Sequence, residues 1–234
     1  MPDHAGDKTL AQYLQPTAFI ERDAPAVRAF VARVVGDAAT DVEKAVRLFY
    51  AVRDEIRYDP YGIELTVDGM KATTTLARRR GFCIAKAVLL AAAARAVGIP
   101  ARLGFADVRN HLTTARLQEQ MGTDIFAYHG FAELWLGGRW VKATPTFNRS
   151  LCDRFGVRAL EFDGKSDAVF HPFDAAGNRH MEYVRDRGNA ADVPLEDLKR
   201  VFFEMYAPLV SGQRPVMSGD FEREAAEETA RQRA

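Results

Sequence analysis

Residues 78–108 read RRRGFCIAKAVLLAAAARAVGIPARLGFADV, and this stretch carries the clearest structural signal in the chain. Gly98 and Pro100 mark the end of a helix, because glycine caps helices readily and proline cannot continue them. The following ARLGFADV has the pattern of a strand. The stretch therefore predicts a helix that begins at Cys83 and leads through a tight turn into a strand over 101–108. The apolar residues at helical spacing, which predict the buried stripe, are Ile84, Ala87, Val88, Ala91, Ala94 and Val97.

The segments upstream predict two more helices. AVRAFVARVV at 26–35 is amphipathic, Pro25 suits its first turn, and Gly36 ends it. VEKAVRLFYAVRDEI at 42–56 has one apolar face, and Thr40 before it is a good N-cap. The breakers in RYDPYG then stop this second helix.

A hairpin is predicted downstream. IFAYHGFAELWL at 125–136 and RWVKAT at 139–144 have strand-like patterns, and Gly137–Gly138 between them is a turn signal. Pro145 ends the second strand. We therefore expect an antiparallel pair of strands after the Cys83 helix.

The remaining segments give weaker signals. Residues 64–82 predict a turn around Asp68–Gly69, then a short helix that enters a basic loop. Residues 109–124 predict an inserted loop or short helix with little power to form core. Loops and short strands are expected from 147 to about 181, and a helix over 194–210.

The composition is that of an ordinary globular protein. The 234 residues include 32 Lys plus Arg and 32 Asp plus Glu, and 47% are hydrophobic. A nucleic-acid partner is not expected, because such proteins usually carry a basic excess. The sequence starts without the pattern of a signal peptide, and no apolar run reaches the roughly 18 residues of a membrane span. We therefore expect a cytoplasmic protein without a membrane partner; the oligomeric state is not indicated.

Metals and cofactors are not expected either. Cys83 and Cys152 are too few for a disulfide framework or an all-cysteine zinc site. His171 and His180 are nine residues apart, outside the short spacings of zinc ligands. The sequence contains no phosphate-binding loop and no GxGxxG. We read Cys152 as an ordinary thiol, because no base stands beside it.

Cys83 is the candidate nucleophile. A helix N-terminus favours a thiolate through its unpaired N–H groups and the helix dipole, and these N–H groups are also suited to hold an oxyanion. Gly81 permits a tight approach and an unusual backbone angle, and Arg78–Arg80 add positive potential, although such a run is commonly a solvated face. The competing interpretation is a buried packing cysteine, which is the commoner role of cysteine in a helix.

His129 is the candidate base. It lies in the predicted strand at 125–136, on the same face as Phe131, Glu133 and Trp135. An imidazole is able to deprotonate a thiol that it meets in space, when a third group orients the ring. A lone strand histidine is more often a satisfied structural residue, so the interpretation depends on Cys83 being its neighbour.

Three blocks in this order resemble the transglutaminase-like superfamily. The first is 78–108, in which Gly-x-Cys opens a helix that leads into a GIPAR turn and strand; the matching residues are Gly81, Cys83, Gly98, Ile99, Pro100, Ala101 and Arg102. The second is YHGFAELWLGGRWVKATPT at 128–146, in which His129 and Trp140 match the family's histidine strand and tryptophan strand. The third is VRLFYAVRDEIRYDPYG at 46–62, which resembles the family's helix ending in a tyrosine.

The resemblance implies an α+β fold with a papain-like transglutaminase core, in which the cysteine-bearing helix packs on an antiparallel sheet. The core would cover about 40–147 within a single domain at 1–218, followed by a charged tail at 219–234 that is either a frayed helix or disordered. The implied chemistry is acyl transfer or hydrolysis through Cys83 and His129. The implied substrate is a peptide, a protein or a small amide.

One position departs from the family pattern. The family usually has Asp four residues after the strand tryptophan, and Thr144 stands there. A threonine hydroxyl accepts a hydrogen bond from an imidazole but supplies no negative charge, and losing the acid of a triad costs several powers of ten in rate. Three interpretations stay open: Thr144 is a weakened third member, Asn148 replaces it, or catalysis is lost. Glu133 is a further candidate on the strand of His129.

The function therefore has competing interpretations. The first is a cysteine hydrolase or a transglutaminase-like acyltransferase, and the second is an inactive member of the fold that serves as a binding or scaffold module. An arylamine acetyltransferase-like enzyme is a third, which the GIPAR block disfavours. Tyr58 and Trp140 are candidates for the wall of a substrate groove, although aromatic residues next to breakers more often cap a core.

Overall fold

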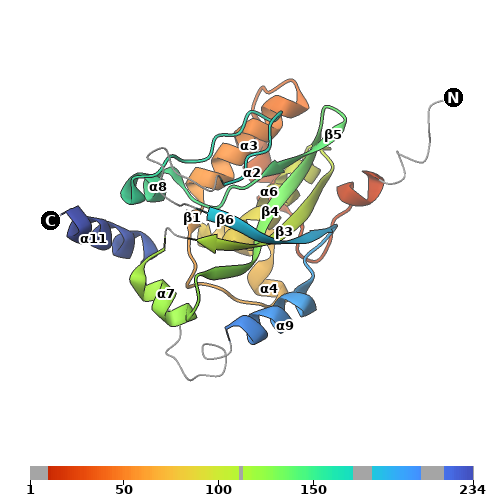
Figure 1. Ribbon diagram of the computed structural model, residues 1–234. Coiled ribbons are helices and arrows are strands. Elements are labelled where there is room, and N and C mark those ends of the chain that lie inside the picture. Colours follow the sequence, from red (N-terminus) through yellow and green to blue (C-terminus); the bar gives the residue numbers. More distant parts are fainter. Residues whose placement is uncertain (1–9, 111–112, 171–180, 207–218, 234) are drawn as a thin grey trace.

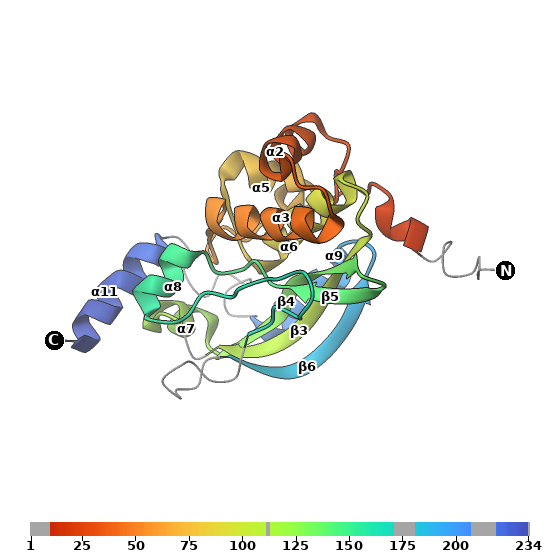
Figure 2. The same ribbon diagram turned by 90° about the horizontal axis from the view of Figure 1, so that it is seen from above.

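The protein has a helical layer packed on one face of a curved antiparallel sheet (Figures 1 and 2). This computed structural model describes residues 10–110, 113–170, 181–206 and 219–233. The main sheet contains four strands in the order β5-β4-β3-β6. Their bounds are β3 Ala101–Asn110, β4 Ile125–Leu136, β5 Arg139–Ala143 and β6 Met181–Ala190. Among the described residues, no helix is long and apolar enough to cross a membrane.

The two helices predicted upstream of Cys83 are confirmed. After a short 3-10 turn, η1 (Gln12–Leu14), α2 spans Pro25–Val35 with Pro25 in its first turn. Helix α3 spans Asp41–Glu55. Its N-cap Thr40 forms a capping box with Glu43, in which each side chain accepts a hydrogen bond from the other residue's backbone N–H.

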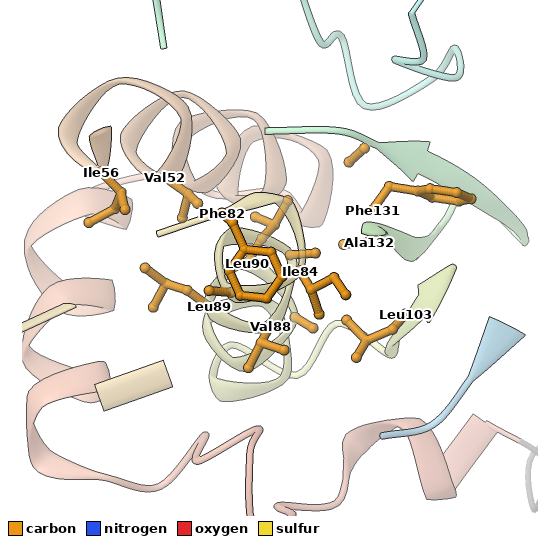
Figure 3. Packing of buried hydrophobic residues seen from close by; sticks show 14 of the residues in the cluster. Val52, Ile56, Phe82, Ile84, Val88, Leu89, Leu90, Leu103, Phe131 and Ala132 are labelled. Carbon is orange, nitrogen blue, oxygen red and sulfur yellow. The ribbon is translucent and has the colours of Figure 1, made fainter. Parts of the chain in front are cut away.

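Helix α6 (Cys83–Ala96) is the centre of the molecule. It begins at Cys83, as predicted, but its residues from Ile84 to Arg95 are buried on all sides rather than along one stripe. Figure 3 shows why: Val52 and Ile56 cover α6 from one side, and Leu103 and the strand residues cover it from the other. Because no side of this helix faces solvent, its sequence has no polar face.

Two charged residues lie inside this helix without contact with solvent. Lys86 and Arg95 are both 0% exposed. The Lys86 ammonium donates to the carbonyl oxygens of Arg53 at 3.0 Å and Ile56 at 2.5 Å, where α3 ends. The Arg95 guanidinium donates to carbonyl oxygens of three separate segments: Gln15, Ala101 and Ala191. Both side chains thus satisfy backbone groups that burial would otherwise leave unpaired.

The predicted hairpin is also confirmed. Strands β4 and β5 pair antiparallel, with Leu136 opposite Arg139, and Gly137 and Gly138 adopt the positive φ angles that glycine tolerates. Strand β6 has no counterpart in the sequence prediction, and it forms the edge of the sheet beside β3. Much of β6 is exposed, so its sequence MEYVRDRGNA lacks the alternation that marks a half-buried strand.

The weakly patterned segments contain more regular structure than predicted. Asp68 and Gly69 lie in a short helix, α4 (Val67–Met70), instead of a turn, and α5 (Ala72–Arg78) follows. Two-residue strands β1 (Arg57–Tyr58) and β2 (Arg80–Gly81) pair in parallel. Helix α7 (Ala115–Met121) is the short helix that was one of the two alternatives for 109–124, and α8 (Arg149–Phe155) forms where loops and short strands were expected.

Helices α9 and α11 are the last two elements of the part of the chain that the structure describes. Helix α9 spans Leu195–Met205; the end of the predicted 194–210 helix, beyond 206, lies outside the described residues, as do His171 and His180. Residues Phe221–Arg233 form α11, which lies beside α8 in both overall views (Figures 1 and 2).

Helix α11, in the segment expected to be a charged tail, is attached to the rest of the protein. Phe221 is buried and its ring contacts those of Tyr58, Tyr61 and Phe155. Glu224 also accepts a hydrogen bond from the Tyr61 hydroxyl. A single buried aromatic side chain and its polar neighbours thus dock a helix whose composition is mostly charged.

Candidate active site

The Cys83 sulfur lies at the first residue of α6, where strand β2 delivers the chain into the helix. Gly81 is not among the glycines with a positive φ, so the backbone does not use the unusual angle that glycine permits here. Space is the actual constraint: a Cβ at Gly81 would lie 3.0 Å from the Ala85 Cβ and 3.4 Å from the Thr75 side chain. Glycine here lets β2 pass close to the first turn of α6.

Cys83 is partly exposed, whereas Cys152 is buried. Burial of the sulfur nevertheless raises the pKa of the Cys83 thiol to about 11, and the backbone N–H groups of Gly130, Ile84 and Cys83 itself oppose this rise. The helix start therefore favours the thiolate as predicted, but desolvation outweighs it. The resting thiol is protonated at neutral pH. Cys152 has a pKa of about 11 as well, again because of burial.

The strand that carries His129 packs directly on the start of α6. A Cβ at Gly130 would lie 2.7 Å from Ile84 Cγ1 and 3.0 Å from the Ile84 Cα, so the strand backbone touches the helix at this point. Since Ile84 follows Cys83 and Gly130 follows His129, the two candidate residues enter the same region from the two elements. Glycine at 130 is what permits this contact.

An irregularity in β4 comes immediately before His129. Ala106 of β3 pairs with His129 and Val108 pairs with Phe126, so a single residue on β3, Asp107, faces two on β4. Tyr128 has a φ of 55°, which is unusual for a residue with a side chain. This is a β-bulge, and bulges redirect the side chains that follow them.

Side chains replace the strand hydrogen bonds that the bulge interrupts. The Tyr128 N–H donates to Asp107 Oδ1 at 3.0 Å, and the Ala127 N–H donates to the Tyr206 hydroxyl at 2.7 Å. Arg187 of β6 holds the Asp107 carboxylate by two hydrogen bonds, at 2.5 and 2.8 Å, and its guanidinium lies 4.7 Å from the Tyr128 ring centre. The direction of His129 therefore depends on a buried ion pair and on α9.

Sequence reasoning missed these supporting residues. Asp107 and Arg187 are eighty positions apart, and Tyr206 belongs to a different helix. A carboxylate inside the strand pattern ARLGFADV was the one signal available, because a charge in a buried strand needs a partner.

The His129 imidazole is 4% exposed, and burial lowers its pKa to about 4. It is therefore neutral at physiological pH. Its Nε2 atom has no hydrogen-bond partner among the described residues, and its ring packs against that of Phe170 with centres 5.7 Å apart. A buried imidazole nitrogen without a partner is unusual in a folded protein and is typical of a functional position.

Cys83 and His129 line one cavity of about 350 Å³. Tyr58 also lines it, as expected for a groove residue, and its hydroxyl lies near the thiol: burial raises the pKa of Tyr58 well above 10, and the Cys83 charge adds to this. The other wall residues are Pro60, Tyr61, Ile63, Leu65, Phe82, Leu117, Met121, Phe126, Ala127, Phe202 and Tyr206. The structure thus brings together three of the residues singled out from sequence.

Thr144 lies directly after β5, 1% exposed, with its hydroxyl unpartnered within the described residues. Its backbone N–H donates to Ala168, two residues before the Phe170 whose ring contacts His129. The Tyr183 side chain of β6 approaches the same segment, although Tyr183 as a whole is 40% exposed. Thr144 is therefore a neutral group that the 168–170 segment connects to His129.

The other sequence candidates have different partners. Asn148 accepts a hydrogen bond from the Tyr58 N–H at 3.0 Å and donates to Glu222 at 2.6 Å, so its amide joins β1 to α11. Glu133 accepts a hydrogen bond from Arg102. Neither residue lines the cavity.

Trp140, the other candidate for a groove wall, does not line this cavity. Its ring packs edge-on against Trp135, opposite it in the hairpin, and the Arg102 guanidinium lies 4.2 Å from its centre. The pairing of Trp135 with Trp140 lies next to the Gly137–Gly138 turn, so Trp140 stabilises the sheet at the turn end of the hairpin. The Arg78–Arg80 run is mainly solvated, as expected, with Arg78 paired to Glu64.

A cysteine-bearing helix packed on an antiparallel sheet, with a histidine strand at its N-terminus, defines a papain-like α+β core. The chain belongs to the transglutaminase-like superfamily: the family's model matches residues 28–145, about half of the chain, and this range contains Cys83, His129 and Thr144. The fold class predicted from the sequence is thus confirmed.

Two solved structures are similar at low identity. One is the "Putative Cysteine Protease from Cytophaga hutchinsonii", with 20% identity and a TM-score of 0.48 over 62% of this chain and 45% of that one. The other is a "Putative Protease from Parabacteroides distasonis", with 16% identity and a TM-score of 0.37 over 58% of this chain and 25% of that one. The chain spans less than half the length of either protein. No curated protein matches it.

Proposed function

We propose that this protein transfers or hydrolyses an acyl group through Cys83 as nucleophile and His129 as general base and then acid. The observation that supports this most directly is that both side chains line one cavity, at the point where α6 and β4 touch. The class of substrate that the family resemblance suggests is a peptide, a protein or a small amide. A cytoplasmic location remains part of the proposal.

The neutral state of both groups defines the first step. With a thiol pKa of about 11 and an imidazole pKa of about 4, the resting pair is uncharged. As the sulfur attacks the carbonyl carbon, the thiol proton passes to His129, and the new C–S bond forms while the carbonyl oxygen becomes negative. His129 then gives this proton to the leaving amine or alcohol. Water or an amine releases the acyl group by the reverse sequence.

Donors for the negative oxygen are available near the sulfur. The phenol of Tyr58 remains protonated, because burial keeps its pKa far above neutrality, and the N–H groups at the start of α6 point out of the helix end. Thr144 is the neutral third member in this proposal. It would accept a hydrogen bond from the imidazolium without compensating its charge, so we expect slow turnover and a preference for activated substrates.

A binding module without catalysis is the second candidate. It is favoured by the raised thiol pKa and by threonine at the position where the family usually has aspartate. In that case the cavity would hold a ligand while Cys83 remained inert.

Acylation by an activated ester distinguishes the two candidates. We expect 4-nitrophenyl butyrate to give a burst of 4-nitrophenolate and a mass increase of one butyryl group located on Cys83. Cys83→Ala should abolish both signals, Cys152→Ala should leave them unchanged, and His129→Gln should slow acylation by about a hundredfold. A wild-type protein that gains no acyl group on Cys83 would support the binding module instead.

A further inference from the structure

The cavity beside Cys83 has an unusual composition for a site that handles amides. Of its wall residues, none carries a formal charge at neutral pH, since His129 and Cys83 are both neutral. Aliphatic and aromatic side chains from five segments form the remainder: the loop before α4, the N-cap residue Phe82 of α6, helix α7, strand β4 and helix α9 with its C-cap Tyr206. An amide or a charge placed against such walls would lose its hydration without gaining a partner.

Two of the three wall tyrosines use their hydroxyl groups elsewhere. The Tyr61 hydroxyl donates to Glu224 of α11. The Tyr206 hydroxyl donates to the Ile125 carbonyl at 3.0 Å and accepts from the Ala127 N–H at 2.7 Å. These rings therefore present mainly carbon to the cavity. The polar groups that remain, those of Cys83, His129 and Tyr58, belong to the proposed catalytic end.

The size of the cavity limits its occupant. An apolar cavity of about 150 Å³ accommodates benzene, so about 350 Å³ is enough for roughly ten to fourteen non-hydrogen atoms. Part of that space must hold the reacting carbonyl. The remainder fits a hydrocarbon chain or a ring with a short linker.

We propose that the acyl group taken by this site is an uncharged apolar chain of about six to twelve carbons, held in this cavity with its carbonyl carbon at the Cys83 sulfur. The proposal rests on the proposed acyl-transfer function and names its substrate class. In the reaction, the C–S bond to the acyl chain forms and the bond to the amine or alcohol breaks, with the proton carried by His129. This acyl transfer requires no oxidant and no cofactor.

Helix α9 supplies a matched pair of positions for the test. Phe202 lines the cavity, whereas its neighbour Phe203 is 61% exposed and does not. A carboxylate at 202 would stand in the apolar wall, and the same change at 203 would stand in solvent. Both variants alter net charge and helix composition equally.

Binding is measured first, with a chain that cannot be acylated. The Cys83→Ala protein is titrated calorimetrically with N-methyl alkanamides of four to twelve carbons, and with an N-acetylglutamine amide as polar comparison. Each added methylene should tighten binding about threefold to fourfold until the cavity is full, which corresponds to about 0.8 kcal/mol per methylene. Phe202→Asp in this background should weaken the longer amides at least tenfold, and Phe203→Asp should leave them unchanged.

The chain-length series is independent of any variant that fails to fold, and circular dichroism checks the folding of Phe202→Asp. Affinity that does not depend on chain length, or tighter binding of the glutamine amide, would overturn the proposal.

Acylation of the wild-type protein by 4-nitrophenyl esters of the same lengths separates this proposal from the proposed function. Length-dependent binding without any acylation would remove the function but keep the apolar cavity as a ligand site. Acylation of Cys83 at rates that do not depend on length would keep the function and remove the apolar specificity.

Discussion

The ionisation of His129 and Cys83 follows from where their atoms lie. The imidazole is almost fully buried, has no carboxylate beside it among the residues that the structure describes, and contacts an aromatic ring, so its neutral form is favoured. The thiol has backbone N–H groups around it, which are too weak to offset its desolvation. In the proposed reaction, the resting pair is therefore a neutral thiol and a neutral imidazole rather than a thiolate and an imidazolium.

This state has a consequence for acid stability. The folded protein keeps His129 neutral down to about pH 4, whereas an unfolded chain protonates it near 6.5. The folded state thus binds fewer protons in this range, so the stabilising effect is complete above pH 6.5 and is lost as the pH falls to 4. We expect urea unfolding to show that the wild type loses about 3 kcal/mol more than His129→Gln between pH 7 and pH 4. Equal losses would mean that the imidazole is hydrated.

At the scale of elements, the bulge in β4 is the feature that places His129. The N–H groups of Tyr128 and Ala127, which lie in the bulge, donate to Asp107 and to the Tyr206 hydroxyl. Arg187 in turn fixes the Asp107 carboxylate. Helix α9 and the edge strand β6 therefore support the position of His129, although neither contributes a proposed catalytic group.

Removing the Asp107 carboxylate should affect turnover more than binding. Asp107→Ala leaves the Tyr128 N–H and the Arg187 guanidinium unpaired, and we expect a loss of about 3 kcal/mol in the free energy of unfolding. Acylation should slow about tenfold or more, while binding of the alkanamides should change little.

Two variants serve as controls for this prediction. Asp107→Asn retains an oxygen that is able to accept from Tyr128 and should recover part of the acylation rate. Arg185→Ala, two residues from Arg187 and exposed, should behave like the wild type. If Asp107→Ala lowers only stability and leaves the acylation rate of the folded protein unchanged, the bulge does not position His129.

The buried Lys86 joins α6 to the end of α3. Its titration makes the stability of the protein depend on pH in a higher range than that of His129. Burial lowers the pKa of Lys86 to about 7, against 10.5 in an unfolded chain. Between these values the folded protein binds fewer protons, so its stability rises with pH, is complete above 10.5, and is lost as the pH falls to 7.

Unfolding of the wild type and Lys86→Met at pH 7 and pH 10 measures this effect. The wild type should gain as much as about 4 kcal/mol relative to Lys86→Met over this range, because all other titrating groups are shared. The exposed Lys165→Met should follow the wild type. A wild type that gains nothing over Lys86→Met would show that the ammonium stays charged inside the protein.

At the scale of the whole molecule, local patterns were enough to predict the parts that face the core. The helix from Cys83, the N-cap at Thr40 and the hairpin at Gly137–Gly138 each depend on neighbours in the sequence, and each is confirmed. The exposed strand β6 was missed because solvent exposure removes its alternating pattern.

The candidate site was predicted only in part, for a related reason. Cys83 and His129 could be found because a helix start and a strand histidine carry local signals and a family resemblance. The pair of Asp107 with Arg187, the position of Trp140 and the apolar cavity depend on contacts between distant segments. Helix α7 was expected to contribute little core, yet Leu117 and Met121 form part of the cavity wall.

The whole account depends on the transfer of the Cys83 thiol proton to His129. In the sequence 45 residues lie between these two, and in the structure both line the same cavity. The most direct measurement is the rate of Cys83 alkylation by iodoacetamide at pH 7.5, in a Cys152→Ala background so that a single thiol reports. We predict that His129→Gln slows this alkylation at least about tenfold, because the general base is lost. Equal rates in the two proteins, with folding unchanged, would contradict the account.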